Sequence, residues 1–455
     1  MGPRMVIITS YFQGQTYGML GPQLAATIIE ENTPYECLVV ALTGEEPFDE
    51  VKKAVYSFLG DRRPVVGFST LSGRPELFEL AASFKEDGVT TVLGGPQAAV
   101  DFLGEEGKDI EPHRFQGYHQ CFTFAVQGPA EQVISLLREE DPALPPEGPG
   151  IVSRRGRTPA QPWDPAFFRF VRWDNLYRVD NGTLLPLRVE SAQVIQQLGC
   201  PYAVAFKEIA VDYPTALGKE GSIPVRLRGC SFCDVATDKG YAGRFPIEIV
   251  VEQIRALPEE NGSKIPFELI NENPLPQLPR LLDEISSRGL KISQIDLVMR
   301  ADWFVRQEQS AREALKRARD RGILIRLASV GLESFADRIL RNLNKGTTRE
   351  INLAAVDLMR RLKDEFPDNW AYANHEGSVH GLIHPTPWDT VESLAEMERT
   401  FGAYGLPYDV LPAHSVPLII HHACPLGDWA RKLEAQEGIR LPRNGNVIGW
   451  WALDG

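Results

Sequence analysis

The chain has 455 residues, of which 43% are hydrophobic and 24% charged, and this ordinary globular composition excludes a disordered or fibrous protein. With 48 Lys and Arg against 61 Asp and Glu the formal net charge is −13, and without a basic block we expect no nucleic-acid partner. The length predicts about two to four domains, and no apolar run has the ~18 residues of a membrane span or forms a signal peptide, so we expect a cytoplasmic protein.

Residues 1–141 alternate short β-branched runs with amphipathic stretches. This alternation is typical of parallel strands covered by helices on both faces, so we predict an α/β, doubly wound (Rossmann-like) N-terminal domain. The predicted strands are Met5–Thr9, Cys37–Leu42, Pro64–Ser69, Thr90–Leu93 and Phe122–Val126. The predicted helices are Gln23–Glu31, Phe48–Leu59, Pro75–Lys85 and Glu131–Glu139.

Small residues follow three of these strands, in Ser69-Thr70-Leu71-Ser72-Gly73, Gly94-Gly95-Pro96 and Gly128-Pro129. Ligands of doubly wound sheets lie beyond the carboxyl ends of the strands. Small residues at those ends let a large flat ligand approach the backbone closely.

A proline-rich stretch follows this domain. Seven of the 34 prolines lie between positions 142 and 165. Proline at this density prevents regular helices and central strands, so we predict a linker over residues 142–189.

Residues 190–412 form a second strand–helix series. Six βα units without a Gly-x-Gly-x-x-Gly turn favour a full or partial barrel, in which the chemistry collects on the loops after the strands. The predicted strands are Ile223–Leu227, Phe267–Ile270, Gln294–Val298, Leu324–Val330, Ser378–Ile383 and Asp409–Leu411. The predicted helices are Pro276–Ser287, Glu308–Arg321, Glu350–Phe366 and Thr390–Phe401. Residues 413–455 remain as a short C-terminal extension.

The most specific local motif is Cys230-Ser231-Phe232-Cys233, directly after the predicted strand Ile223–Leu227. Two thiolates three residues apart can bind one soft metal centre. The spacing alone leaves zinc, a redox dithiol and an iron–sulfur cluster open. A structural zinc site needs a second ligand pair, and none lies nearby in the sequence.

Two further motifs give this cysteine loop a family context: Val330-Gly331-Leu332-Glu333-Ser334 and Leu340-Arg341-Asn342-Leu343-Asn344-Lys345-Gly346. Together with the cysteine loop, they make residues 190–411 resemble the radical S-adenosylmethionine (SAM) superfamily. The N-terminal part resembles the cobalamin-binding domain that precedes the barrel in one branch, through Val66-Gly67-Phe68-Ser69, Leu93-Gly94-Gly95-Pro96 and Val126-Gln127-Gly128-Pro129-Ala130-Glu131. The resemblance implies a partial (β/α)6 barrel, a [4Fe–4S] cluster, SAM and cobalamin.

The chain departs from this family at the first cluster cysteine. The family pattern is Cys-x₃-Cys-x₂-Cys, but position 226 is an arginine. Deleting Val204–Gly229 would join Cys200-Pro-Tyr-Ala to Cys230-Ser-Phe-Cys233 and restore the pattern. We therefore predict Cys200, Cys230 and Cys233 as the metal ligands, with an inserted loop that returns to the cluster. In the alternative, Cys200 is a core cysteine and the cluster has lost a ligand.

The resemblance also implies a SAM site beyond the barrel strands. Asn271, Glu272 and Asn273 match the region that binds the SAM amino group, and Arg300 matches a basic position used for the carboxylate. The expected contacts to ribose, methionine and adenine are Ser329, Glu333, Ser334, Phe232 and Leu382. In the alternative, such polar residues are helix caps or solvated loop ends, as Ser334 illustrates.

For cobalamin, the Asp-x-His-x-x-Gly motif is absent, since no histidine precedes His113. The resemblance therefore predicts a cobalt whose lower face is open, water-bound or covered by residues 70–74. The cobalamin-binding residues that we predict are Ser69, Thr70, Leu71, Arg74, Gly94, Gly95, Gln97 and Gly128. A degenerate domain without cobalamin, with Arg74 only starting a helix, stays open.

The other cysteines and the C-terminal histidines carry weaker signals. Cys37, Cys121 and Cys424 lie in or beside apolar runs, where a buried small side chain is the default. His414, His421 and His422 suggest a rim position near the barrel mouth, although a structural role is favoured. Trp429, Trp450 and Trp451 either close over the substrate or pack.

The function implied by the resemblance is C-methylation of an unactivated carbon by a methyltransferase that uses a [4Fe–4S] cluster, SAM and methylcobalamin. The alternatives are a radical SAM rearrangement, cyclisation or oxidation, or, in a different class, a non-catalytic iron–sulfur electron carrier or SAM-binding sensor. The expected partners are a small-molecule or peptide substrate and a reductant such as a flavodoxin or ferredoxin.

Overall fold

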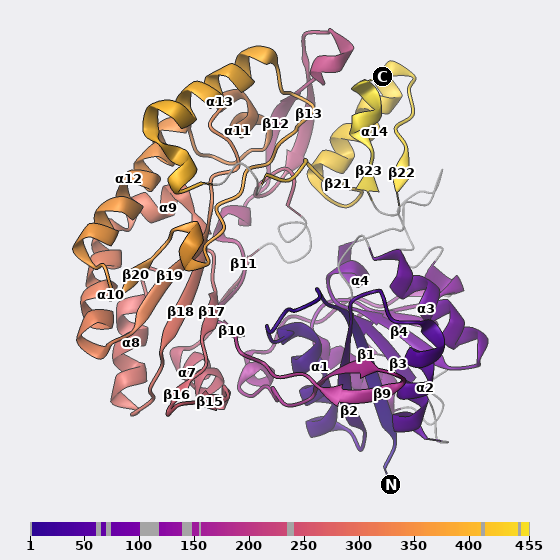
Figure 1. The fold of residues 1–455 in the computed structure, drawn as a ribbon. Helices are drawn as coiled ribbons and strands as arrows, with labels where there is room; N and C mark the ends of the chain where they lie inside the picture. The colour runs from indigo at the N-terminus through magenta and orange to yellow at the C-terminus, as the bar shows by residue number, and fades with distance from the viewer. Residues whose placement is uncertain are drawn as a thin grey trace. The chain divides into compact units, whose positions relative to one another are not determined.

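The computed structural model describes residues 2–60, 65–69, 74–100, 118–138, 148–153, 156–233, 241–410, 415–444 and 447–454. The chain divides into two compact units (Figure 1). Unit 1 comprises Met1–Ala192 and Ala256–Pro258, and unit 2 comprises Gln193–Arg255 and Glu259–Gly455. In the described ranges no helix is both long and apolar enough to span a membrane.

Unit 1 is built on a nine-stranded sheet in the order β7-β6-β5-β4-β3-β1-β2-β8-β9. Its strands are β1 (Arg4–Ser10), β2 (Glu36–Leu42), β3 (Val65–Ser69), β4 (Thr90–Gly94), β5 (Phe124–Val126), β6 (Ile151–Ser153), β7 (Gly156–Arg157), β8 (Leu176–Asp180) and β9 (Thr183–Pro186). Strands β1 to β5 pair in parallel. The predicted α/β fold with a parallel-rich sheet is therefore confirmed.

Apolar side chains bury this sheet under the helices of unit 1. The helices and short 3-10 turns are α1 (Leu20–Asn32), α2 (Phe48–Leu59), α3 (Pro75–Glu86), α4 (Pro96–Val100), η1 (Tyr118–Gln120), η2 (Ala130–Gln132), α5 (Val133–Arg138) and η3 (Pro165–Phe168). Val6 and Ile8 of β1 share one core with Phe68 of β3 and Phe84 of α3, and all four are at most 1% exposed. Continuous apolar runs such as Val-Ile-Ile suit a strand covered on both faces.

The strand order places a topological switch between β1 and β3. The chain runs outward from β1 to β2 on one side and from β3 through β4 to β5 on the other. In doubly wound sheets of this order the ligand lies at the switch point, beyond the carboxyl ends of the strands. Ser69 and Gly94 end β3 and β4 beside this point.

The stretch predicted as a linker contributes four strands to the same sheet. Strands β6 and β7 extend the β5 edge in antiparallel fashion, while β8 pairs in parallel with β2 and β9 pairs antiparallel with β8. The prolines between positions 142 and 165 lie outside these strands, and β9 only ends at Pro186. Short edge strands of this kind tolerate neighbouring prolines, because few of their N–H groups are needed by the ladder.

Unit 2 contains a five-stranded sheet in the order β10-β17-β18-β19-β20. Its strands are β10 (Ala192–Ile195), β17 (Phe267–Ile270), β18 (Gln294–Arg300), β19 (Leu324–Gly331) and β20 (Trp370–Ala371). The three successive pairs from β17 to β20 are parallel. Figure 1 shows helices along one face of this sheet. The helices of unit 2 are α7 (Ile247–Ala256), α8 (Leu278–Ser287), α9 (Ala301–Arg306), α10 (Glu308–Arg321), α11 (Asp337–Asn342), α12 (Arg349–Glu365), α13 (Val391–Tyr404) and α14 (Pro425–Glu437).

The first strand of the second series was predicted wrongly. Ile223–Leu227 does not open the barrel sheet, because it lies in β13 (Ser222–Leu227), which pairs antiparallel with β12 (Lys207–Asp212) in a separate hairpin. β10 occupies the position beside β17 instead. Within the predicted strand Ser378–Ile383, only Leu382 and Ile383 form isolated bridges. Asp409 follows the 3-10 turn η7 (Leu406–Tyr408), and Leu411 lies outside the described residues.

Short pieces complete unit 2. They are β11 (Gln197–Gly199), β14 (Tyr241–Arg244), β15 (Glu259–Glu260), β16 (Ser263–Lys264), η4 (Pro201–Ala203), η5 (Thr215–Leu217), η6 (Asn374–Glu376) and, in the C-terminal extension, β21 (Ile420–His421), β22 (Arg443–Asn444), β23 (Val447–Ile448) and η9 (Trp450–Asp454). The extension shares a hydrophobic core with the β12–β13 hairpin, in which Val225, Leu227, Trp388, Trp429 and Trp450 are buried. Trp429 and Trp450 therefore pack against the hairpin.

Buried His422 makes the stability of this core sensitive to acid. The residue is 8% exposed, and its Nε2 has no hydrogen-bond partner among the residues that the structure describes. Burial, and then the neighbouring Arg443 and Arg431, lower the pKa of His422 to about 4. The unfolded chain takes up this proton near pH ~6.5, so the folded state loses stability as the pH falls below that value.

Urea unfolding at pH 7 and at pH 5 tests this effect. We expect His422 alone to remove about 2 kcal/mol of unfolding free energy between these two pH values. The variant His422→Asn should lose that part of the pH dependence, whereas His375→Asn, at an exposed histidine, should retain it. An unchanged pH dependence in His422→Asn would contradict the assignment.

Candidate functional site

The β12–β13 hairpin brings two distant cysteines together in unit 2. Cys200 begins the turn η4, and the hairpin pairs Lys207 with Leu227 three residues before Cys230. Cys230 contributes to the raised pKa of Cys200, which indicates that the two thiols lie near one another. The segment between residues 204 and 229 thus folds back on itself in a hairpin, and Cys200 lies near the Cys230 loop.

A segment after α11 holds the cysteine loop in place. The backbone N–H and the hydroxyl of Ser231 donate to the carbonyls of Leu343 and Asn342, at 3.0 and 2.8 Å. The side-chain amide of Asn344 donates to the carbonyl of Gly229. Within the loop, Cys233 N–H donates to the Cys230 carbonyl at 3.3 Å. Segment 342–344 therefore fixes the backbone from which two of the three cysteines project.

The cysteine thiols lie in a buried and partly cationic environment. Burial raises the pKa of Cys200 to about 11, with further contributions from Glu272 and Cys230 that exceed the opposing effect of Arg300. Burial also raises the pKa of Cys230, against the lowering effects of Lys345 and Arg300. The raised pKa values keep Cys200 and Cys230 protonated at neutral pH, so binding a metal centre would release their protons.

Arg300, at the end of β18, points at the cysteine loop. Its Nη1 donates to Cys230 Sγ at 3.6 Å, and its Nε donates to Asp302 Oδ1 at 2.9 Å. Its Nη2 donates to the Lys345 carbonyl. The sequence predicts a contact to the SAM carboxylate here, whereas the structure turns the guanidinium towards Cys230.

A buried ion pair lies on the same side of the cysteine loop. Lys345 Nζ contacts Glu333 Oε1 at 2.8 Å, and Lys345 is 5% exposed. Glu333 adopts a left-handed backbone at φ 61°, and its strand bridge to Leu382 fixes this turn. Burial raises the pKa of Glu272, while Lys345 and then Arg300 oppose the rise. The predicted residues Glu272, Arg300 and Glu333 thus share one electrostatic environment with Cys200 and Cys230.

The three residues after β17 have different roles. Asn271 is saturated within the protein, because its Nδ2 donates to Gln196 at 2.7 Å and its Oδ1 accepts from Asn273 N–H at 2.8 Å. Asn273 Oδ1 is buried and has no partner within the described structure. An orphaned acceptor suits an ammonium donor from a ligand, since an unpaired buried oxygen is costly. Asn273 and Glu272, rather than Asn271, are available to a ligand.

The remaining predicted SAM contacts are dispersed. Ser334 is buried, and its Oγ accepts from Ala336 N–H at 3.1 Å. It is not the N-cap that the sequence left open, because the N-cap of α11 is Ala336. Phe232 packs against the hydrophobic core of the C-terminal extension. Ser329 lies on β19 at a register shift, and Leu382 is 3% exposed.

Several residues of this site were missed by sequence reasoning. Tyr202 stacks on Arg300, with 4.0 Å between the guanidinium carbon and the ring centroid. Asn352 donates to the carbonyls of Leu332 and Ser334, at 2.9 and 2.8 Å, and so anchors the turn that carries Glu333. Lys345 lies inside the motif Leu340–Gly346, but the sequence alone indicates no function for it. A lysine between asparagine and glycine is typical of a solvated turn, and its burial is seen only in the folded structure.

The donor set fits an iron–sulfur cluster. Cys200, Cys230 and Cys233 form no disulfide within the described part of the chain. Within the described ranges, no three His, Cys, Asp or Glu side chains converge as ligands of one metal ion. A [4Fe–4S] cluster takes one thiolate at each of several irons and so accommodates cysteines that do not meet at one point. Nearby Arg300 and Lys345 offset the negative charge that such a centre would bring.

In unit 1, the described part of the predicted cobalamin site lies at the carboxyl edge of the sheet. Ser69 ends β3, and its carbonyl accepts from Thr9 Oγ1 at 2.9 Å. A Cβ built on Gly94 would meet only the Phe68 carbonyl, at 3.8 Å, so the space beside this strand end is open. Gly95 has φ 80°, and Gln97 is buried. Thr70 and Leu71 lie outside the described residues.

Two predicted cobalamin residues have structural partners of their own. Arg74 is ion-paired with Glu76 and donates to the Thr43 carbonyl at 3.0 Å, so it joins the start of α3 to the loop after β2. Gly128 has φ 82°, and a Cβ there would lie 2.7 Å from the Gln132 amide. Gln132, which the sequence did not single out, organises this loop through the carbonyl of Gln127, at 3.0 Å.

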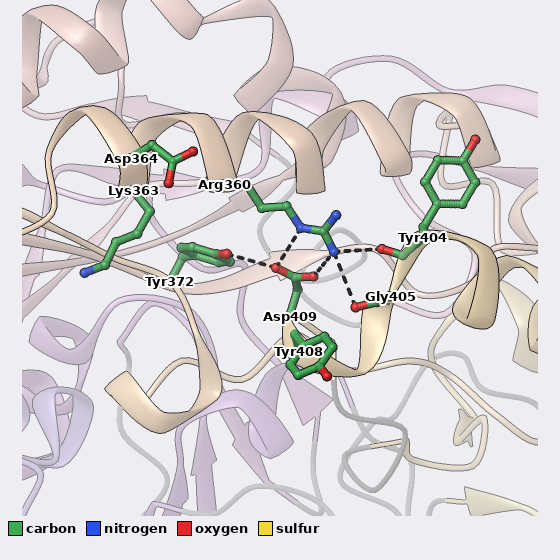
Figure 2. A pocket seen from close by; sticks show the side chains of 8 residues that line it. All are labelled: Arg360, Lys363, Asp364, Tyr372, Tyr404, Gly405, Tyr408 and Asp409. Carbon is green, nitrogen blue, oxygen red and sulfur yellow. Dashed lines mark hydrogen bonds and ion pairs between the residues drawn. The ribbon is translucent and has the colours of Figure 1, made fainter.

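A polar pocket of about 500 Å³ lies away from the cysteine loop, between α12 and the chain after α13 (Figure 2). Arg360 is ion-paired there with buried Asp409, which also accepts from Tyr372 Oη at 2.9 Å. Lys363 contacts Glu376 at 2.6 Å. These charges neutralise one another within the protein, so the pocket is not a preferred site for a charged ligand.

Comparison with known proteins supports the fold. No family model matches the chain, and no curated protein matches its sequence. A solved structure of the radical S-adenosylmethionine methyltransferase TsrM from Kitasatospora setae, with cobalamin and a [4Fe–4S] cluster bound, is similar with a TM-score of 0.60. The identity is 16%, and the match covers 97% of this chain and 79% of TsrM. TsrM with tryptophan substrate and the SAM analogue aza-SAM bound gives 0.58 at 16% identity, covering 96% and 77%. The chain therefore has the fold of these TsrM structures.

Replacing Cys200 tests its predicted role as a ligand. After anaerobic reconstitution with iron and sulfide, Cys200→Ala should lose most of the [4Fe–4S] optical and paramagnetic signal, because one of three thiolates is removed. Cys121→Ala, which changes a half-buried cysteine of unit 1, should keep the wild-type iron content. An intact cluster in Cys200→Ala would reject the assignment.

Proposed function

We propose that this protein is a cobalamin-dependent radical SAM enzyme that methylates carbon. The observation that carries the proposal is the proximity of Cys200 to Cys230, which lies three residues before Cys233 and beside buried Arg300 and Lys345. The TsrM-like fold supports it, because cobalamin and a [4Fe–4S] cluster are bound in a TsrM structure of similar fold.

The domain assignment follows from the same proposal. Residues 1–141 form the cobalamin-binding domain, residues 142–189 connect it to the barrel while adding edge strands, residues 190–412 form the radical SAM barrel, and residues 413–455 form the C-terminal extension. The division of the chain at Ala192 supports the boundary before the barrel.

In unit 2, side chains of the protein would bind and orient the cluster and SAM. The three cysteines would hold the cluster, and Asn273 with Glu272 would accept hydrogen bonds from the SAM amino group. When bound, the cluster and SAM supply one-electron and alkyl-transfer chemistry, and cobalamin supplies a methyl carrier. Buried Leu382 and the Glu333 turn would close one wall of the SAM site and keep water out.

In unit 1, the carboxyl edge at the β1/β3 switch point would receive cobalamin. Ser69, Gly94 and Gly95 present backbone and little side chain there, which suits the broad face of a corrin ring. Arg74 is already engaged by Glu76 and the Thr43 carbonyl. It would therefore keep a fixed cation at this edge.

Methyl transfer from SAM can be tested without knowing the final substrate. Anaerobically reconstituted protein is mixed with reduced cobalamin and SAM carrying a deuterated methyl group. We expect S-adenosylhomocysteine and transfer of the labelled methyl group to cobalamin, both measured by mass spectrometry. Addition of tryptophan, the substrate named for the TsrM structure, is the first trial for a carbon acceptor. Cofactor-loaded protein that yields neither product would contradict the proposal.

A glycine substitution tests the cobalamin site independently of catalysis. Gly94→Leu has room for its Cβ and should fold normally, but its side chain would occupy the proposed corrin site. We expect cobalamin affinity to fall at least roughly tenfold, or about 1.4 kcal/mol, in an equilibrium binding titration. Gly21→Leu makes the same change at an exposed glycine of α1 with nothing within 4 Å, and should bind like the wild type. Equal affinity of both variants would place cobalamin elsewhere.

A further inference from the structure

The guanidinium of Arg300 is held by the protein at all three of its nitrogens. Each of its three nitrogens has a partner: Nε donates to Asp302 at 2.9 Å, Nη1 to Cys230 Sγ at 3.6 Å and Nη2 to the Lys345 carbonyl. The residue is 4% exposed, and Asp302 is 6% exposed. A buried guanidinium with a hydrogen bond from each of its three nitrogens has little freedom to rotate towards another anion.

Aromatic rings fix the orientation further. The guanidinium carbon lies 4.0 Å from the ring centroid of Tyr202 and 5.1 Å from that of Trp303, which are cation–π distances. Gly346 leaves room for Tyr202, because a Cβ there would lie 2.6 Å from the Tyr202 hydroxyl. Tyr202 follows Cys200 by two residues, so the same turn that supplies one cysteine also supplies the ring over Arg300.

We propose that Arg300 is a positioning residue for the iron–sulfur cluster. It donates a hydrogen bond to the Cys230 thiolate and raises the reduction potential of the cluster, in place of the contact to the SAM carboxylate that the sequence predicts. This inference rests on the proposed function, since it requires the cluster.

The physical reason is the charge that reduction adds. One electron passes from an external one-electron reductant to the cluster, and no bond forms or breaks. The extra negative charge spreads over the irons, the sulfides and the thiolates. A buried cation that donates to one thiolate stabilises the reduced cluster more than the oxidised one, and hydrogen bonds to sulfur are a recognised control on cluster potential. Asp302 neutralises Arg300 only in part, because it lies on the Nε side while Nη1 faces the sulfur.

The test is a redox titration of the cluster, followed by paramagnetic resonance, in wild type and Arg300→Met. The equilibrium constant for one-electron reduction should fall at least roughly tenfold in the variant, which is about 59 mV towards more negative potential. Arg306→Met is the matched control, because Arg306 reaches the same Asp302 at 4.0 Å but its side chain is 67% exposed. It should titrate like the wild type.

If Arg300→Met does not take up the cluster, two further variants test the same inference. Tyr202→Leu removes the ring and leaves the charge, so its potential should shift in the same direction by less. Arg300→Lys keeps a cation without the fork, and its potential should lie between those of wild type and Arg300→Met. Potentials equal to the wild type in all cluster-loaded Arg300 variants would overturn the inference. A wild-type protein that holds no [4Fe–4S] cluster would instead overturn the proposed function.

Ligand binding supplies a second readout. SAM and its decarboxylated analogue are titrated into wild type and Arg300→Met. If Arg300 serves the cluster, loss of the carboxylate should weaken binding by the same factor in both proteins. A penalty present in wild type and absent from Arg300→Met would show a direct contact between Arg300 and the carboxylate, and would overturn the inference.

Discussion

The site of unit 2 depends on the attachment of the cysteine loop to the segment after α11. The loop has no regular structure between Cys230 and Cys233, so its position comes from the hydrogen bonds of Ser231 and Gly229 to Asn342, Leu343 and Asn344. Each such bond contributes only about 1 kcal/mol net, but a broken one leaves a buried polar group unpaired. The Lys345 carbonyl continues the same segment and orients Arg300. One short stretch of chain thus sets both the thiols and the cation that faces them.

The hairpin between Cys200 and Cys230 links this site to the C-terminal extension. Inward-facing Val225 and Leu227 of β13 alternate with exposed Pro224 and Arg226, which is the pattern of a strand with one buried face. Their buried face packs with Trp429 and Trp450 of the extension. The extension therefore stabilises the hairpin that returns the chain to the cluster cysteines.

Most of the parallel strands could be predicted, because a buried strand corresponds to a local run of apolar residues in the sequence. Met5–Thr9 and Gln294–Val298 lie within β1 and β18. The errors fell where local sequence is ambiguous. Ile223–Leu227 has the composition of any strand, and only its antiparallel pairing with Lys207–Asp212 separates a hairpin from a barrel strand. The edge strands β6 and β7 lie among the prolines between positions 142 and 165, which argued against any strand there. β8 and β9 lie beyond Pro165 in a stretch without proline up to position 185, and they were missed because the predicted linker was extended to residue 189.

The sequence by itself determined the α/β class and most of the parallel strands, and it grouped Cys200 with the later cysteines as a hypothesis, because apolar runs and motif spacing are local properties of the chain. Tertiary structure decided which polar residues are available for chemistry. Asn271 and Ser334 bond to neighbours, Asn273 Oδ1 has no partner in the described part of the chain, and Arg300 faces Cys230. The reason is that the hydrogen bonds of a side chain depend on its neighbours in space. These can be distant in sequence, as with Arg300 and Cys230, which are 70 positions apart.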